Sequence, residues 1–137
     1  MAAKKLVVRV DEATKGVLHG GAGTFRVLID EPTCGAKHVS LLTNTSNAGT
    51  VGSAHQHDVE HYFYILSGTG TMHIGDESYA LRPETAVFVP PHTMHQIVVD
   101  DGADLNYIVL YAPPGPEQQL IRKQARAFDE DGGSSSH

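Results

Sequence analysis

The sequence predicts an all-β domain, either a sandwich or a barrel of short strands. Short runs rich in β-branched and aromatic residues recur between residues 24 and 111. Turn residues separate these runs at fairly even intervals, and no segment before residue 112 has the periodicity of a long helix. Even spacing of short strands is typical of sandwiches and barrels.

Eight segments meet the criteria for strands. Clusters of glycine, proline, asparagine and aspartate separate them, among them Glu31-Pro32, Ser67-Gly68 and Gly75-Asp76. The predicted strands are 24–29, 37–42, 61–66, 70–74, 77–81, 86–89, 96–99 and 105–111.

Two further segments flank the predicted barrel of residues 24–112. Residues 1–23 form an N-terminal arm, and residues 113–137 form a tail. The run Pro113 to Pro116 ends the barrel, because proline cannot donate a hydrogen bond to a central strand. Residues 117–128 are expected to form a short helix, and the acidic, Gly/Ser-rich residues 129–137 are expected to be disordered.

Composition excludes several classes of partner. A chain of 137 residues fits one domain, and its net charge of −6 argues against nucleic acid and against an anionic membrane surface. Only Cys34 is present, so no internal disulfide can form and a cytoplasmic location is expected. No run approaches the roughly 20 apolar residues of a membrane span. A small molecule is the expected ligand.

Four histidines predict a metal site. His55 and His57 are two residues apart, so on an extended strand they point to one face, roughly 6.6 Å apart along the chain. His61 shares their parity, and His95 ends a second histidine-containing stretch. Imidazole is the commonest metal ligand in proteins. Glu60 is the rival to His61, but its opposite parity should point it away from the site.

The remaining histidines are less informative. His19, His38 and His137 are interpreted as ordinary surface or core residues. His73 alternates with core-like neighbours and can face either the cavity or the solvent, and His92 lies in the loop before His95. A purely structural zinc is the alternative for the cluster, although structural sites favour cysteine and close all four positions.

Two segments resemble the motifs of the cupin family. Residues 52–61 with the following Gly68 are similar to the first cupin motif, and residues 83–95 are similar to the second. The resemblance implies a small double-stranded β-helix, or jelly-roll barrel, that binds a metal. It also has departures: His61 stands at the usual glutamate position, and Glu84 and His92 stand where glycines are common.

The ligand set favours zinc. Imidazole suits zinc, copper, iron and nickel, and loss of the motif glutamate removes the carboxylate typical of many iron oxygenase sites. We therefore expect one divalent ion, preferably Zn²⁺, with Fe, Mn, Ni, Co and Cu as open alternatives.

Within the cupins, the chain most resembles the small cyclases of bacterial aromatic polyketide pathways. The similar pieces are residues 25–28, 33–36 and 81–83. This resemblance implies ring closure of a poly-β-ketone by aldol condensation and dehydration. A dioxygenase of the flavonol- or diketone-cleaving type is the main alternative, and a non-enzymatic ligand-binding module is the third.

Three further expectations concern the catalytic base, assembly and the cavity wall. A metal-bound hydroxide is preferred as the base, with His73 second if it faces inward and His92 third. Residues 6–10 are expected to add to a neighbour's sheet in a homodimer. An apolar wall around the substrate is expected from Tyr62, Phe63, Tyr64, Met72, Phe88 and Met94.

Overall fold

The structure is a computed structural model that describes residues 4–131, without the side chains of residue 19 and residues 124–131. The described chain forms two antiparallel sheets. Six strands make the larger sheet, in the order β1-β2-β3-β9-β4-β7, and three make the smaller one, in the order β6-β5-β8. The strands are β1 (Thr14–Val17), β2 (Gly23–Ile29), β3 (Ser40–Ser46), β4 (Glu60–Ser67), β5 (Gly70–Ile74), β6 (Glu77–Leu81), β7 (Ala86–Val89), β8 (His95–Val99) and β9 (Leu105–Ala112).

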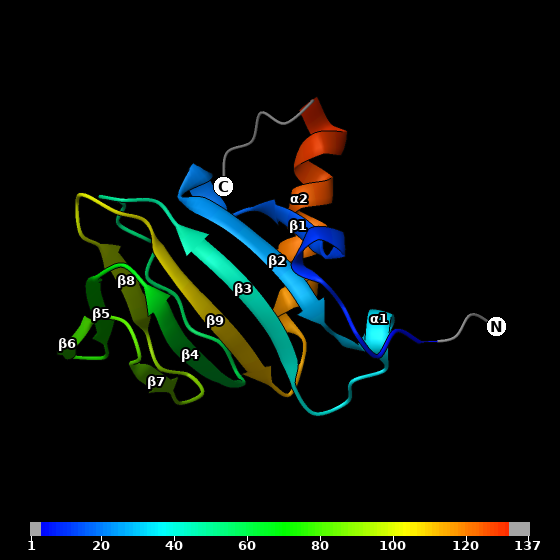
Figure 1. Cartoon of the computed structure of the whole chain (residues 1–137), viewed down its shortest axis with the longest axis horizontal. Coiled ribbons are helices and arrows are strands. Elements are labelled where there is room, and N and C mark those ends of the chain that lie inside the picture. The colour runs from blue at the N-terminus through cyan, green and yellow to red at the C-terminus, as the bar shows by residue number, and fades with distance from the viewer. Residues whose placement is uncertain (1–3, 132–137) are drawn as a thin grey trace.

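Two helices accompany the sheets. The short α1 (Glu31–Cys34) follows β2, and α2 (Pro116–Asp131) follows β9. In Figure 1 the long strands β2, β3 and β9 run side by side, with α2 near β1 and the small sheet at the opposite side. No helix among the described residues is long and apolar enough to cross a membrane.

The inner faces of both sheets enclose one core. Every second residue of β9 is buried, from Leu105 to Tyr111, and β4 buries His61, Phe63 and Ile65 in the same way. A strand places alternate side chains on opposite faces, so this pattern identifies the faces that meet in the core. The core consists of Phe25, Val27, Leu42, Phe63, Ile65, Met72, Leu81, Val89, Val99, Leu105, Tyr107, Val109 and Tyr111.

The all-β fold predicted from the sequence is confirmed. All eight predicted strands are present, and β5, β6 and β7 have the predicted bounds. The structure adds β1 within the segment predicted as an arm, where it pairs with β2. The C-terminal helix is longer than predicted and reaches Asp131. The segment 129–137 was expected to be disordered, and residues 132–137 of it lie outside the described residues.

Backbone conformation accounts for the glycine pattern of the two motifs. Gly68 has a φ of 91°, and a Cβ at this position would collide with the backbone carbonyl of Asp104. Glu84 and His92, which replace glycines of the cupin pattern, have φ angles of 64° and 61°. This left-handed region is costly for residues that carry a Cβ. Both substitutions therefore retain a backbone shape that suits glycine.

Candidate metal centre and substrate cavity

The backbone places His55 and His95 opposite each other. The N–H of His55 donates to the carbonyl of His95 at 3.0 Å, and the N–H of His95 donates to the carbonyl of His55 at 2.9 Å. Directly opposed residues of an antiparallel pair project their side chains from the same face. The two ring centroids accordingly lie 4.4 Å apart.

His57 completes a group of three. Its ring centroid is 5.0 Å from that of His55 and 5.7 Å from that of His95. The backbone N–H of His92 donates to the backbone carbonyl of His57 at 2.6 Å. This hydrogen bond ties the segment that carries His57 to the loop before β8. One ring nitrogen from each of His55, His57 and His95 lies within 4.8 Å of the others, a grouping that can hold a metal ion.

His61 lies behind this group, on β4. Its ring centroid is 5.2 Å from those of His57 and His95, and it packs against Phe63 at 4.1 Å and Tyr111 at 4.4 Å. It is outside the group of three, although it faces the same interior and is only 4% exposed.

Glu60 points to the other face of β4. Its carboxylate accepts a hydrogen bond of 2.6 Å from the Tyr62 hydroxyl, and the Tyr62 ring contacts Phe88. The alternation along β4 therefore separates Glu60 from the histidine cluster.

Backbone carbonyls fix the tautomers of two rings. The carbonyl of Ser53 lies 3.0 Å from His55 Nδ1, and the carbonyl of Thr93 lies 3.1 Å from His95 Nδ1. A carbonyl only accepts, so each Nδ1 carries the proton and each Nε2 keeps its lone pair. Metal-binding histidines usually donate their second ring nitrogen in this manner.

Several buried nitrogens in the cluster have no hydrogen-bond partner among the described residues. These are Nε2 of His57, Nε2 of His95 and both ring nitrogens of His61. Unpaired buried polar atoms are uncommon and costly, and a binding site for an ion is one standard reason for them. The donor set and its unpaired atoms thus fit a metal ion such as zinc.

Burial keeps these rings neutral. It lowers the pKa of His57 to about 4, and His55 and His95 lower it further by charge repulsion. Burial also lowers the pKa of His95 to about 4 and that of His61 well below its ordinary value. A neutral imidazole is the form that binds a metal, so the site is suited to metal binding at neutral pH.

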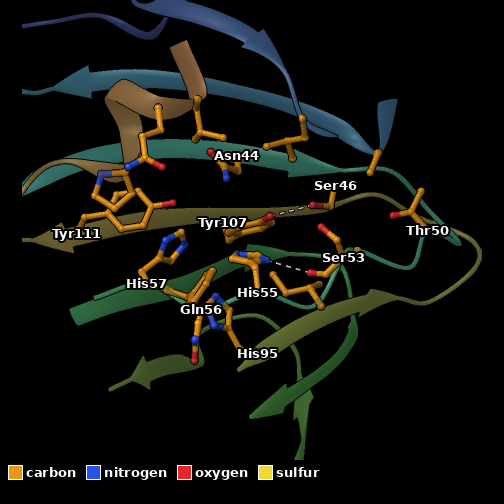
Figure 2. Close-up of a pocket in the computed structure, with 18 of the residues that line it drawn as sticks. Asn44, Ser46, Thr50, Ser53, His55, Gln56, His57, His95, Tyr107 and Tyr111 are labelled. Atoms are coloured by element: carbon orange, nitrogen blue, oxygen red, sulfur yellow. Dashed lines mark hydrogen bonds between the residues drawn. The ribbon is translucent and has the colours of Figure 1, made fainter. Parts of the chain in front are cut away.

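A cavity of about 510 Å³ opens in front of the three histidines. Figure 2 shows His55, His57 and His95 at one end and Asn44, Ser46 and Tyr107 on the wall formed by β3 and β9. Helix α2 contributes Leu120 and Lys123 to the lining. Among the described side chains, the lining contains neither aspartate nor glutamate.

The two other candidate catalytic residues lie outside this cavity. His73 is on β5 beside the buried Met72 but faces the opposite way, and its Nδ1 lies 2.8 Å from the hydroxyl of Ser78 on β6. The inward orientation on which its role as a base depended is therefore absent. His92 is exposed in its loop, and neither histidine is among the residues that line the cavity.

The predicted apolar wall requires correction. Of the six residues expected to form it, only Phe63 lines the cavity. Met72 belongs to the core, and Met94 is exposed in the loop before β8. The remaining three, Tyr62, Tyr64 and Phe88, lie on the outer faces of β4 and β7. The observed aromatic wall includes Tyr107 and Tyr111 of β9 instead. Both occupy odd-numbered positions of the predicted strand 105–111, which share one face, and this parity was the available signal.

Comparison with known proteins agrees with this fold and site. A family model described as the cupin domain matches residues 45–111. The match covers just under half of the chain, and the two sheets form the jelly-roll fold seen in solved cupin structures. Comparison with curated proteins finds no significant match.

Solved structures with the same fold include enzymes of different kinds. The polyketide cyclase RemF from Streptomyces resistomycificus is 23% identical over 79% of this chain and 80% of its own, with a TM-score of 0.67. KdgF from Halomonas sp. is 21% identical over 82% of this chain and 98% of its own, with a TM-score of 0.69. A predicted oxalate decarboxylase from Thermotoga maritima is 19% identical over 80% of this chain and 100% of its own, also with a TM-score of 0.69. At these identities the likeness shows the fold alone.

Proposed function

We propose that this protein is a metal-dependent cyclase that closes a ring on a poly-β-ketone by aldol condensation and dehydration. One observation carries the proposal: among the described residues, histidines with unpaired ring nitrogens lie at the end of a largely apolar cavity that no carboxylate lines. The cavity volume of about 510 Å³ falls in the range of small-molecule sites. We expect the protein to act in the cytoplasm, because its single cysteine gives no sign of an oxidising compartment.

The histidine cluster would hold the ion. His55, His57 and His95 are the three first candidates, and His61 is the fourth. Zn²⁺ is favoured, because the candidate ligands are all imidazoles and Glu60 faces away. When bound, the ion supplies Lewis acidity that polarises a ketone oxygen.

The chain itself would position and polarise the substrate. Burial raises the pKa of the Tyr111 hydroxyl, so this group stays protonated and can donate a hydrogen bond to a substrate oxygen. Its ring lies 5.5 Å from that of His57, at the histidine end of the cavity. Phe63 and Tyr107 offer apolar ring surface to a flat intermediate, and Leu120 on α2 helps to exclude water.

Charge at the cavity edge fits an enolised substrate. Among the described lining residues, Lys123 is the only lysine or arginine, and no acidic residue of that set offsets its charge. A fixed positive charge favours a substrate that accumulates negative charge as a methylene proton leaves. The similarity of fold to the polyketide cyclase RemF is consistent with this substrate class.

The test is turnover of a synthetic linear poly-β-ketone by zinc-loaded protein under argon and under air, followed by mass spectrometry. We expect the same product in both, with the mass of the substrate minus water. The His95→Ala protein should lose this activity, whereas His38→Ala, which changes an exposed histidine, should retain it. A product that contains added oxygen and forms only in air would instead identify a dioxygenase. Binding without turnover in either gas would identify a ligand-binding module.

A further inference from the structure

We propose that Asn44, Ser46 and Tyr107 form a polar subsite that binds a neutral hydroxyl group of the substrate, specifically a phenol or enol. The subsite lies in the same cavity as the histidines, and the proposed cyclase function supplies only the substrate class. Its hydrogen-bonding capacity is independent of whether a metal is bound.

Strand pairing brings the three residues together. Asn44 and Tyr107 are direct partners in the register of β3 and β9, and Ser46 follows Asn44 on the same face. The hydroxyls of Ser46 and Tyr107 lie 2.8 Å apart, as the dashed line in Figure 2 shows. All three side chains line the cavity, although they are only 8%, 7% and 4% exposed.

The side-chain oxygen of Asn44 is an acceptor that receives no hydrogen bond from the described residues. Its Oδ1 is buried and has no hydrogen-bond partner among the described residues. The neighbouring inward positions are apolar: Leu42 precedes it on β3, and Phe25 opposes it on β2. Native proteins rarely leave a buried acceptor unpaired, because its desolvation is then uncompensated. A ligand that supplies a donor would remove this cost.

The hydroxyl pair supplies the complementary donor. One hydrogen bond between Ser46 and Tyr107 uses one of their two protons, so the other proton is left to donate. Burial also raises the pKa of Tyr107, which keeps its proton in place at neutral pH. The subsite therefore offers one acceptor and one donor side by side. A phenol or enol hydroxyl matches both, whereas an ether or an ionised carboxylate has no proton to donate to the Asn44 oxygen.

The position of the subsite sets the shape of the ligand. The Phe63 ring lies 5.8 Å from Tyr107 and 6.2 Å from His95, so it is close to both the polar subsite and the histidines. A molecule held at both ends would lie across Phe63. This arrangement suits a flat chain or ring system with a hydroxyl at one end and a ketone at the other.

The test compares binding of 2-naphthol with that of 2-methoxynaphthalene by calorimetry. Both zinc-loaded and chelator-treated protein are used. We expect wild-type protein to prefer the naphthol by roughly tenfold in both forms, since a hydrogen-bonding site rejects an analogue that leaves its polar groups unpaired. In Asn44→Leu the preference should fall below about threefold, with the affinity for the ether unchanged or increased.

Control variants separate the subsite from general damage. Asn106→Leu makes the same change on the neighbouring strand but on the outer face, where Asn106 bonds Thr45 and Ser67, and it should keep the full preference. Ser46→Ala removes a hydroxyl and leaves Asn44 in place. It should reduce the preference severalfold, which keeps the proposal testable if Asn44→Leu does not fold.

Three results would overturn the subsite: equal binding of both probes by wild-type protein, an undiminished preference in the folded variants, or a preference that appears only with zinc. The last would assign the recognition to the metal. Failure of the cyclase assay alone, with the naphthol preference intact in both protein forms, would reject the proposed reaction and leave the subsite standing.

Discussion

Ring nitrogens without a hydrogen-bond partner in the described part of the chain distinguish the histidine cluster from ordinary buried histidines. His61 carries two such atoms in a pocket between Phe63 and Tyr111. A neutral ring buried in this way gains little from the chain itself, and a bound ion would compensate for the lost hydration. The sequence predicts that His61 faces the same interior as the other histidines. It does not predict that the His61 ring lies outside the group formed by His55, His57 and His95.

Metal content tests whether His61 is a ligand. The His61→Ala protein should bind zinc at least tenfold more weakly than wild-type protein, because a direct ligand is lost. Glu60→Ala should retain wild-type affinity, since Glu60 faces away and bonds Tyr62. Competition against a chelator of known affinity, with elemental analysis of the dialysed proteins, measures both. Weakened zinc binding in Glu60→Ala but not in His61→Ala would identify Glu60, rather than His61, as the ligand.

The stability of the metal-free protein should depend on pH through the same rings. Burial lowers the pKa of His57 and His95 from the ordinary 6.5 to about 4, so at intermediate pH the unfolded chain binds protons that the folded chain does not. Acidification therefore favours unfolding. The stability is fully present above about pH 6.5 and is lost as the pH falls towards 4.

Urea denaturation of chelator-treated protein at pH 7.5 and pH 5 measures this effect. The midpoint should fall on acidification in wild-type protein and fall less in a protein with His57→Gln and His95→Gln. A wild-type urea midpoint that is the same at pH 7.5 and pH 5 would contradict the prediction. It would show that His57 and His95 bind protons as readily in the folded protein as in the unfolded chain.

At the scale of secondary structure, strand bounds are predictable where turn residues mark both ends and are missed where polar residues continue a strand. β5, β6 and β7 are bounded by clear turn residues, and their limits follow from the sequence. β3 was predicted as 37–42 but spans Ser40–Ser46, because the polar run from Thr43 to Ser46 does not look like a buried strand. The misjudged part contains Asn44 and Ser46, the two polar residues that β3 turns towards the cavity. Local rules tend to fail at functional positions.

β1 and the cavity lining were not predictable for related reasons. β1 is short, and most of its residues are exposed, so it has no alternating apolar pattern. The lining combines β3, β9, the loop before β4 and helix α2, segments that only the folded topology brings together. Motif spacing predicts the histidines, but it cannot place residues from distant strands around them.

Helix α2 is fixed to the barrel by a buried carboxylate. Glu117 is 1% exposed, accepts a hydrogen bond of 2.7 Å from the Ser40 hydroxyl of β3 and accepts another of 3.0 Å from the Gly115 N–H. The same helix carries Leu120 and Lys123 into the cavity lining. This anchor therefore positions part of the proposed substrate site.

Replacement of Glu117 by alanine should lower the free energy of unfolding by about 2 kcal/mol, because the Ser40 hydroxyl loses its acceptor and a void forms. Ligand affinity should fall as well, while metal content should stay unchanged, since the histidines lie on other elements. Chemical denaturation measures the first effect. Glu77→Ala, an exposed change on β6, is the control and should have little effect. Equal stability of the two variants would reject the anchor.

At the scale of the whole molecule, the chemistry is assembled where the two sheets face each other. His61 comes from β4 of the large sheet, whereas His95 begins β8 of the small sheet and pairs with His55. The cluster thus depends on the relative position of both sheets. A bound ion would link them, so metal should raise the stability of the whole domain as well as enable the reaction.

Assembly into a homodimer remains a prediction at this scale. Leu6 and Val7 are 84% and 79% exposed, and residues 6–10 belong to no strand of the described chain. The outermost strands of the large sheet, β1 and β7, are positions where a neighbour's segment can add. Burial of these apolar side chains against a second copy would account for their presence at the surface.

Light scattering coupled to size-exclusion chromatography tests this assembly. We expect a dimer mass at micromolar concentration for wild-type protein and a monomer mass for a protein that carries Leu6→Asp and Val7→Asp, since buried charges oppose the contact. Ala80→Asp and Ala103→Asp, exposed changes on β6 and in the loop before β9, serve as the matched control and should leave the dimer intact. Metal content should be the same in all three proteins, because the histidines lie far along the chain in the barrel. A wild-type monomer at these concentrations would reject the pairing.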